Sequence, residues 1–189
     1  MNIAAISVLK PNEEPILAGR LNGKRIFLRV LDELSALDGP ATVILDFKPA
    51  EIATSSALSE LVLPLRDHLR SRRPPAYVVV ANLADKVAEE LDDLLSRSGE
   101  AILACNFSKP KNISKARLFG RLDPKLLETF EMIRRKGETS AVELHDESAG
   151  NGIGPTGWNN RLAALASKSL VMETSHGRTK KYRPVLEIA

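Results

Sequence analysis

The sequence holds few of the residues from which covalent cross-links and metal centres are built. Its 189 residues include one cysteine, Cys105, and three histidines, at positions 68, 145 and 176. A lone cysteine cannot form an internal disulfide, and its place in the apolar run "AILAC" predicts a buried strand thiol rather than a reactive one. The separated histidines offer no ligand spacing for zinc, so we expect no metal site and no cofactor.

Long apolar runs and familiar catalytic patterns are lacking too. No run approaches the roughly 20 residues that span a bilayer, and "MNIAAISVLKPNEEP" lacks the features of a secretory signal, which predicts a cytoplasmic protein without membrane contact. The stretch "GNGIGP" follows a predicted helix rather than a strand, and it lacks the lysine of a phosphate loop. The carboxylates between 89 and 93 are typical of a solvated helix face. We therefore expect that the protein is not an enzyme.

Charge is distributed unevenly, although the net charge is only +3. Residues 1–107 carry 12 Lys and Arg against 15 Asp and Glu, whereas residues 108–189 carry 15 against 9. This asymmetry predicts two domains with different partners, the second of which prefers a polyanion.

Strands and helices alternate in the first part of the chain. The apolar pattern predicts strands at 3–8, 41–47, 76–83 and 101–107, and helices at 22–39, 55–71 and 84–99. A short strand at 15–18 is expected to pair with the first strand, and Asn22 is expected to cap the first helix. Such alternation predicts an α/β domain over 1–107, with a mixed, mostly parallel sheet and helices packed on it. Residues 108–121 are polar with little periodicity and predict a linker.

The second part follows a different order. Helices are predicted at 122–138, 139–148 and 155–170, and two strands in 170–188 surround a turn at His176 and Gly177. Asp123 is expected to cap the first helix, and Ser140 with Glu143 has capping-box spacing for the second. Together with "NRLAAL", "KSLV" and the basic "HGRTKKYRPV", this order resembles the winged helix-turn-helix domains of bacterial regulators. The resemblance implies an α+β domain over 122–189 that binds double-stranded DNA.

The helix that begins at "TGWNNRLAAL" carries the predicted contacts with bases. A helical projection places Trp158, Leu162 and Leu165 inward, Asn160 outward, and Asn159 at the edge of the outward face. An asparagine amide both donates and accepts, so it can pair with adenine. Alternatively, the two asparagines are solvated surface residues, or the domain mediates only protein contacts. The residues predicted to contact DNA are Thr156, Asn159, Asn160, Arg161, Lys168, Arg178, Lys180, Lys181 and Arg183.

A second resemblance lies in "VILDFKPAEIATSSALSEL" (43–61). A strand ending at Asp46, a loop, and a serine-containing turn at a helix start are similar to the STAS domains of anti-sigma-factor antagonists, and closer to bacterial STAS-like domains. The resemblance implies a protein partner, such as a kinase-like ATPase or another regulator, and makes Ser55 a candidate phosphorylation site. Two positions depart from the pattern, because Thr54 replaces an aspartate and Ala57 a glycine. The alternative is that Ser55 or Thr54 only caps the helix.

These observations predict a bacterial, DNA-binding transcription regulator in which a STAS-like domain receives a signal by protein contact. Regulators of this kind often bind two DNA half-sites as homodimers. The alternative is a STAS-type interaction switch whose winged helix serves assembly rather than DNA binding.

Overall fold

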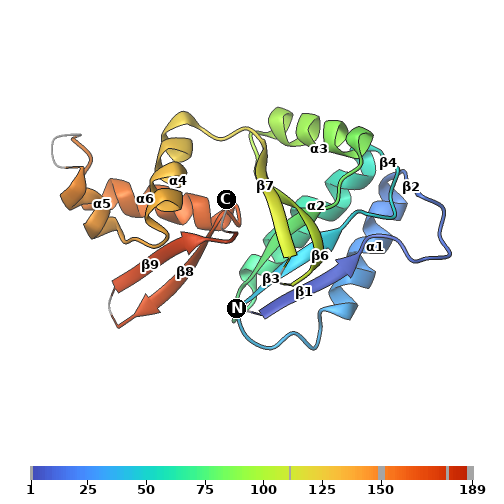
Figure 1. Cartoon of the computed structure of the whole chain (residues 1–189), viewed down its shortest axis with the longest axis horizontal. Coiled ribbons are helices and arrows are strands. Elements are labelled where there is room, and N and C mark those ends of the chain that lie inside the picture. Colours follow the sequence, from blue (N-terminus) through green and yellow to red (C-terminus); the bar gives the residue numbers. More distant parts are fainter. Residues whose placement is uncertain (1, 111, 149–151, 178, 187–189) are drawn as a thin grey trace.

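The computed structural model describes the chain in four stretches, residues 2–110, 112–148, 152–177 and 179–186. Two parts lie side by side (Figure 1). We call the part up to residue 120 the sheet half and the part from residue 124 onward the helix–hairpin half. The sheet half is built on a 5-stranded sheet in the order β1-β3-β5-β6-β7, parallel except for β7. Its strands are β1 (Asn2–Ser7), β3 (Ala41–Asp46), β5 (Ala76–Ala81), β6 (Ala101–Lys109) and β7 (Asn112–Gly120).

Three helices cover one face of this sheet. They are α1 (Arg20–Glu33), α2 (Ser55–Ser71) and α3 (Asp85–Ser98). Each connection between parallel strands moves the chain one position in the same direction, and right-handed crossovers of that kind place all helices on the same side. Figure 1 shows this layer. The predicted α/β class with a mixed, mostly parallel sheet is thus confirmed for this half.

The opposite face of the sheet is buried as well. Along β3, Val43 and Leu45 belong to the apolar core beneath the helices, whereas Ile44 between them belongs to a second core. That second core continues into the helix–hairpin half, where it includes Trp158 and Leu165. Because both faces are covered, the central strands are continuous apolar runs, which is why they were visible in the sequence.

Two short strands form a separate pair. β2 (Ile16–Leu17) is parallel to β4 (Ile52–Ala53), with Ile16 opposite Ile52. The prediction that 15–18 pairs with the first strand is wrong, since β1 pairs with β3. The reason is local: β2 leads directly into α1, and β4 leads into α2.

The first helix begins at Arg20 behind Gly19, so the predicted cap at Asn22 is wrong. This helix ends at Glu33 rather than at 39.

The segment predicted as a linker, 108–121, is mostly strand. β7 runs antiparallel to β6 and closes the edge of the sheet. Phe119 is buried, and Ile113, Ala116 and Leu118 pack against the second core. Two irregularities in the β6–β7 register, together with the polar residues on the exposed side, broke the period-two pattern by which a strand is recognised.

The helix–hairpin half has the predicted element order. Its elements are α4 (Pro124–Lys136), α5 (Ala141–Glu147), α6 (Pro155–Ser167), β8 (Val171–His176) and β9 (Thr179–Pro184). The Asp123 side chain caps α4, and Ser140 with Glu143 forms the capping box of α5, as predicted. Thr139 also forms an isolated antiparallel bridge with Tyr182 of β9. This bridge ties the entrance of α5 to the hairpin.

No helix within the described ranges is long and apolar enough to cross a membrane.

Candidate functional site

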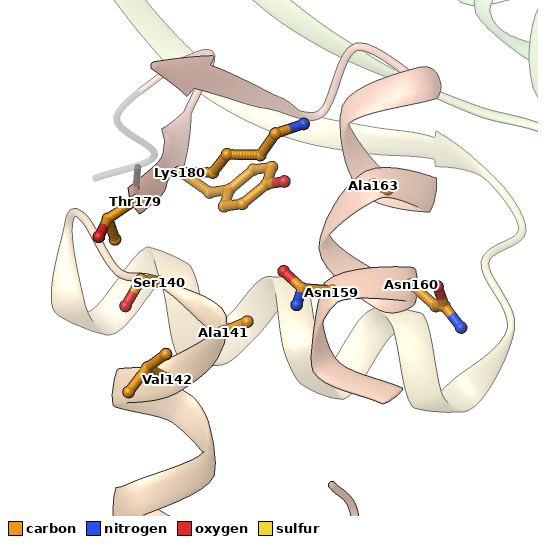
Figure 2. A pocket seen from close by; sticks show the side chains of 9 residues that line it. Ser140, Ala141, Val142, Asn159, Asn160, Ala163, Thr179 and Lys180 are labelled. Atoms are coloured by element: carbon orange, nitrogen blue, oxygen red, sulfur yellow. The ribbon is translucent and has the colours of Figure 1, made fainter. Parts of the chain in front are cut away.

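A groove of about 500 Å³ lies between α5, α6 and β9. Its walls come from the start of α5, from the exposed side of α6 and from the hairpin, so three separate segments of the chain meet there (Figure 2). The lining residues are Ser140, Ala141, Val142, Asn159, Asn160, Ala163, Thr179, Lys180 and Tyr182.

Buried side chains fix α6 beneath this groove. Trp158, Leu162 and Leu165 are each at most 1% exposed, which confirms the predicted inward face. The guanidinium of Arg161 lies over the Trp158 ring, 5.1 Å from its centre. Pro155 occupies the start of α6, where its missing N–H costs no hydrogen bond. The helix is therefore held by one apolar side and presents the other to solvent.

The two asparagines lie on different sides of the exposed face. Both are exposed and both line the groove. Figure 2 shows Asn159 on the side of α6 that faces Ala141 of α5, whereas Asn160 points away from α5. The helical projection favours Asn160, because it treats α6 as an isolated helix. It therefore cannot show which part of the outward face lies beside another element. The wall formed by α5 instead places Asn159 on the side of α6 that faces into the groove.

Two of the predicted DNA contacts are engaged inside the protein. Arg161 stacks on Trp158 and donates to Thr129 Oγ1 at 3.4 Å, and its side chain is 16% exposed. Lys168 Nζ lies 2.8 Å from a carboxylate oxygen of Glu100 in the sheet half. Both cations, which are predicted to contact phosphate, therefore already have partners within the protein. The sequence could not reveal this, because Glu100 is distant in the chain.

The remaining cations lie on the hairpin. Lys180 Nζ is 2.8 Å from Glu173, with 57% of its side chain exposed. Lys181 Nζ is 2.8 Å from Glu143, a hydrogen bond that raises the pKa of Lys181. Arg183 is exposed and has no ion-pair partner within the described stretches. Arg178 lies outside the described residues, and Thr156 is exposed in the first turn of α6.

Sequence reasoning missed the wall contributed by α5. Val142 is 56% exposed, and it lies at the groove with Ser140 and Ala141. The capping box had located the start of this helix. Its contribution to the site became visible only once the bridge between Thr139 and Tyr182 placed α5 beside β9.

The serine turn of the sheet half has a clear capping geometry. Thr54 is the N-cap of α2, and its Oγ1 accepts from Ala57 N at 3.4 Å and from Gly19 N at 3.1 Å. The capping alternative is thus confirmed for Thr54. Ser55 Oγ donates to the Glu90 carboxylate at 2.5 Å, so a phosphate there would meet a negative group. Phosphorylation of Ser55 stays a prediction, which intact-mass measurement after incubation with cell lysate tests.

Within the part of the chain that the structure describes, groups that could support redox or metal chemistry are not brought together. Cys105 is buried, and burial, with a smaller effect from Asp46, raises the pKa of its thiol to about 11, which disfavours the reactive thiolate. Among the described residues, no three His, Cys, Asp or Glu side chains are grouped so that they could hold a metal ion.

Comparisons of the chain with protein-family models, with curated proteins and with solved structures found no match.

Proposed function

We propose that the helix–hairpin half binds double-stranded DNA through the groove between α5, α6 and β9. The observation that carries the proposal is the meeting of an exposed helix face, a capped helix start and a basic hairpin around one groove of about 500 Å³. The order α4, bridge at Thr139, α5, α6, β8, β9 resembles that of a winged helix-turn-helix, which supports the proposal. In that arrangement α6 enters the major groove, which is wide enough for a helix, and the hairpin follows the backbone.

The chemistry of the groove favours contact with bases. Asn159 offers an amide that can donate to and accept from adenine. Ala163, one turn further along α6, leaves room for close approach, and the exposed Val142 could pack on a thymine methyl group. Asn160 is the second candidate for a base contact, at the edge of the same face.

The hairpin supplies the contacts with phosphate. Lys180 and Arg183 are exposed, and the ion pair of Lys180 with Glu173 is of the surface kind that contributes little free energy. A phosphate can replace that carboxylate as its partner. Lys181 is less accessible because Glu143 holds it beside the capping box.

A salt series tests the proposal. Binding of a fluorescent duplex should weaken steeply as salt rises, since each phosphate contact releases counterions. Lys180→Ala should lower affinity for all sequences alike and reduce the slope of log K against log salt by about 1. Lys24→Ala, which removes an exposed cation of α1, is the matched control and should leave the slope unchanged. No binding at low salt, or equal slopes for Lys180→Ala and wild type, would contradict the proposal.

One observation favours a second candidate, a protein-interaction switch in which the helix–hairpin half serves assembly. Lys168, Lys180 and Lys181 each lie 2.8 Å from a carboxylate, so the basic surplus of this half is partly neutralised within the protein. In this alternative the sheet half receives a protein partner near the α2 start, and the groove binds protein. Absence of duplex binding at every salt concentration, with retained protein association, would favour it.

A further inference from the structure

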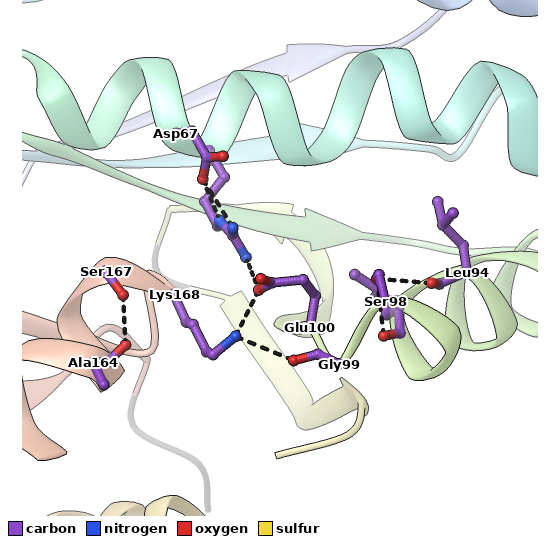
Figure 3. A network of polar contacts seen from close by, with 10 residues as sticks. Asp67, Leu94, Ser98, Gly99, Glu100, Ala164, Ser167 and Lys168 are labelled. Atoms are coloured by element: carbon purple, nitrogen blue, oxygen red, sulfur yellow. Dashed lines mark hydrogen bonds and ion pairs between the residues drawn. The ribbon is translucent and has the colours of Figure 1, made fainter. Parts of the chain in front are cut away.

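The segment that joins α6 to the hairpin is tied to the sheet half at two points. The first lies at the end of α6, where Lys168 is the C-cap residue. Its Nζ donates to the Glu100 carboxylate at 2.8 Å and to the Gly99 carbonyl at 3.2 Å (Figure 3). Both acceptors belong to the turn between α3 and β6. The end of the proposed recognition helix is therefore anchored on the other half of the molecule.

Glu100 is itself held firmly. Arg66 of α2 donates to the same carboxylate at 2.7 Å, and Arg66 is only 5% exposed. Burial opposes the charged form of Glu100, yet the hydrogen bonds from Lys168 and Arg66 keep the pKa of Glu100 below its ordinary value. The carboxylate thus stays ionised at neutral pH. It links Arg66 of α2 to Lys168 at the end of α6.

The second tie lies in the hairpin. The backbone N–H of Glu173 in β8 donates to Tyr77 Oη of β5 at 3.0 Å. Tyr77 is buried, and the Arg70 guanidinium of α2 lies over its ring at 4.8 Å. Glu173 in turn pairs with Lys180 of the groove. Both ends of the 168–173 segment are consequently fixed by residues that contact α2.

We propose that Glu100 and Tyr77 are positioning residues, which set how α6 lies against the hairpin and so couple the sheet half to the groove. The effect on DNA affinity rests on the proposed function, whereas the coupling between the halves does not. A partner that displaces α2 would act on the groove through Arg66 and Arg70, because these two arginines contact the two ties.

Glu100→Gln separates positioning from simple charge. Removal of a carboxylate from a protein that binds a polyanion should by charge alone strengthen binding. A positioning role predicts the opposite, a loss of at least about fivefold in duplex affinity. Lys168→Met should lose as much duplex affinity as Glu100→Gln, and the variant with both changes should lose no more than either single variant. Lys168→Arg, which keeps the cation, should restore the duplex affinity that Lys168→Met loses. Glu60→Gln, which removes a half-buried carboxylate of α2 paired only at 3.9 Å with Arg20, is the charge control. Unchanged or tighter binding by Glu100→Gln overturns the proposal and leaves DNA binding itself intact.

Hydrogen exchange provides a readout without DNA. Tyr77→Phe keeps the buried ring but frees the Glu173 amide, whose exchange should become about fivefold faster. Glu100→Gln should accelerate exchange in the last turn of α6, while the amides of α4 remain as protected as in wild type. If wild type does not bind DNA, the proposed function fails, and these exchange rates alone decide the coupling. Unchanged exchange in both variants would overturn it.

Discussion

Replacement of Trp158 by alanine should lower the free energy of unfolding by about 3–5 kcal/mol, the range found when a buried large aromatic is truncated. Trp158 is 1% exposed and belongs to the apolar core shared by both halves. Its loss opens a cavity beneath α6 and removes the ring on which Arg161 lies. Urea denaturation measures the change. Duplex binding should fall with it, because α6 loses its anchor.

Trp158→Phe is the matched control. The indole Nε1 is buried and has no hydrogen-bond partner within the described residues, so the phenyl ring loses volume but sacrifices no polar contact. This variant should cost clearly less than Trp158→Ala. If both variants lost the same free energy of unfolding, the size of the side chain would not decide the packing here. A loss below about 1 kcal/mol for Trp158→Ala would contradict the placement of Trp158 in the core.

Gly23→Val should strongly destabilise the sheet half. A Cβ atom at position 23 would lie 2.3 Å from the backbone carbonyl oxygen of Ala57, where α1 crosses α2. Backbone cannot move aside as a side chain can, so the helices must separate. We expect the free energy of unfolding to fall by about 3 kcal/mol, because overpacking of a tight interior typically costs about 1–3 kcal/mol and a β-branched side chain adds crowding.

The neighbouring exposed residue supplies the comparison for this variant. Lys24 lies on the solvent side of α1. Its replacement by alanine should therefore change the free energy of unfolding by less than about 0.5 kcal/mol. Thermal unfolding of the two variants beside wild type measures both changes. A Gly23→Val protein as stable as Lys24→Ala would contradict the close crossing of α1 and α2.

Elements that leave a clear local pattern in the chain could be predicted from the sequence. β3 and β5 are covered on both faces and therefore appear as apolar runs, and the caps at Asp123 and Ser140 depend on neighbours within three residues. β7 could not be recognised, because an edge strand with register shifts has no strict alternation. The pairing of β2 with β4 was missed for another reason, namely that two residues carry no periodic signal.

The candidate site shows the same division. The inward face of α6 follows from helical spacing alone, so Trp158, Leu162 and Leu165 were placed correctly. The outward face depends on what stands beside it. Nothing local in the sequence reveals that Lys168 pairs with Glu100, and the wall that α5 forms beside Asn159 is likewise a long-range feature.

Selection from a random pool of duplexes tests the central claim, DNA recognition by this groove, most directly. The wild-type chain should enrich a common site that contains adenine. Asn159→Ala should reduce preference at one position of that site by about 1–3 kcal/mol while affinity for unselected duplex changes little. Failure of the wild type to enrich any sequence, or enrichment of an identical site with equal strength by Asn159→Ala and Asn160→Ala, would contradict the account.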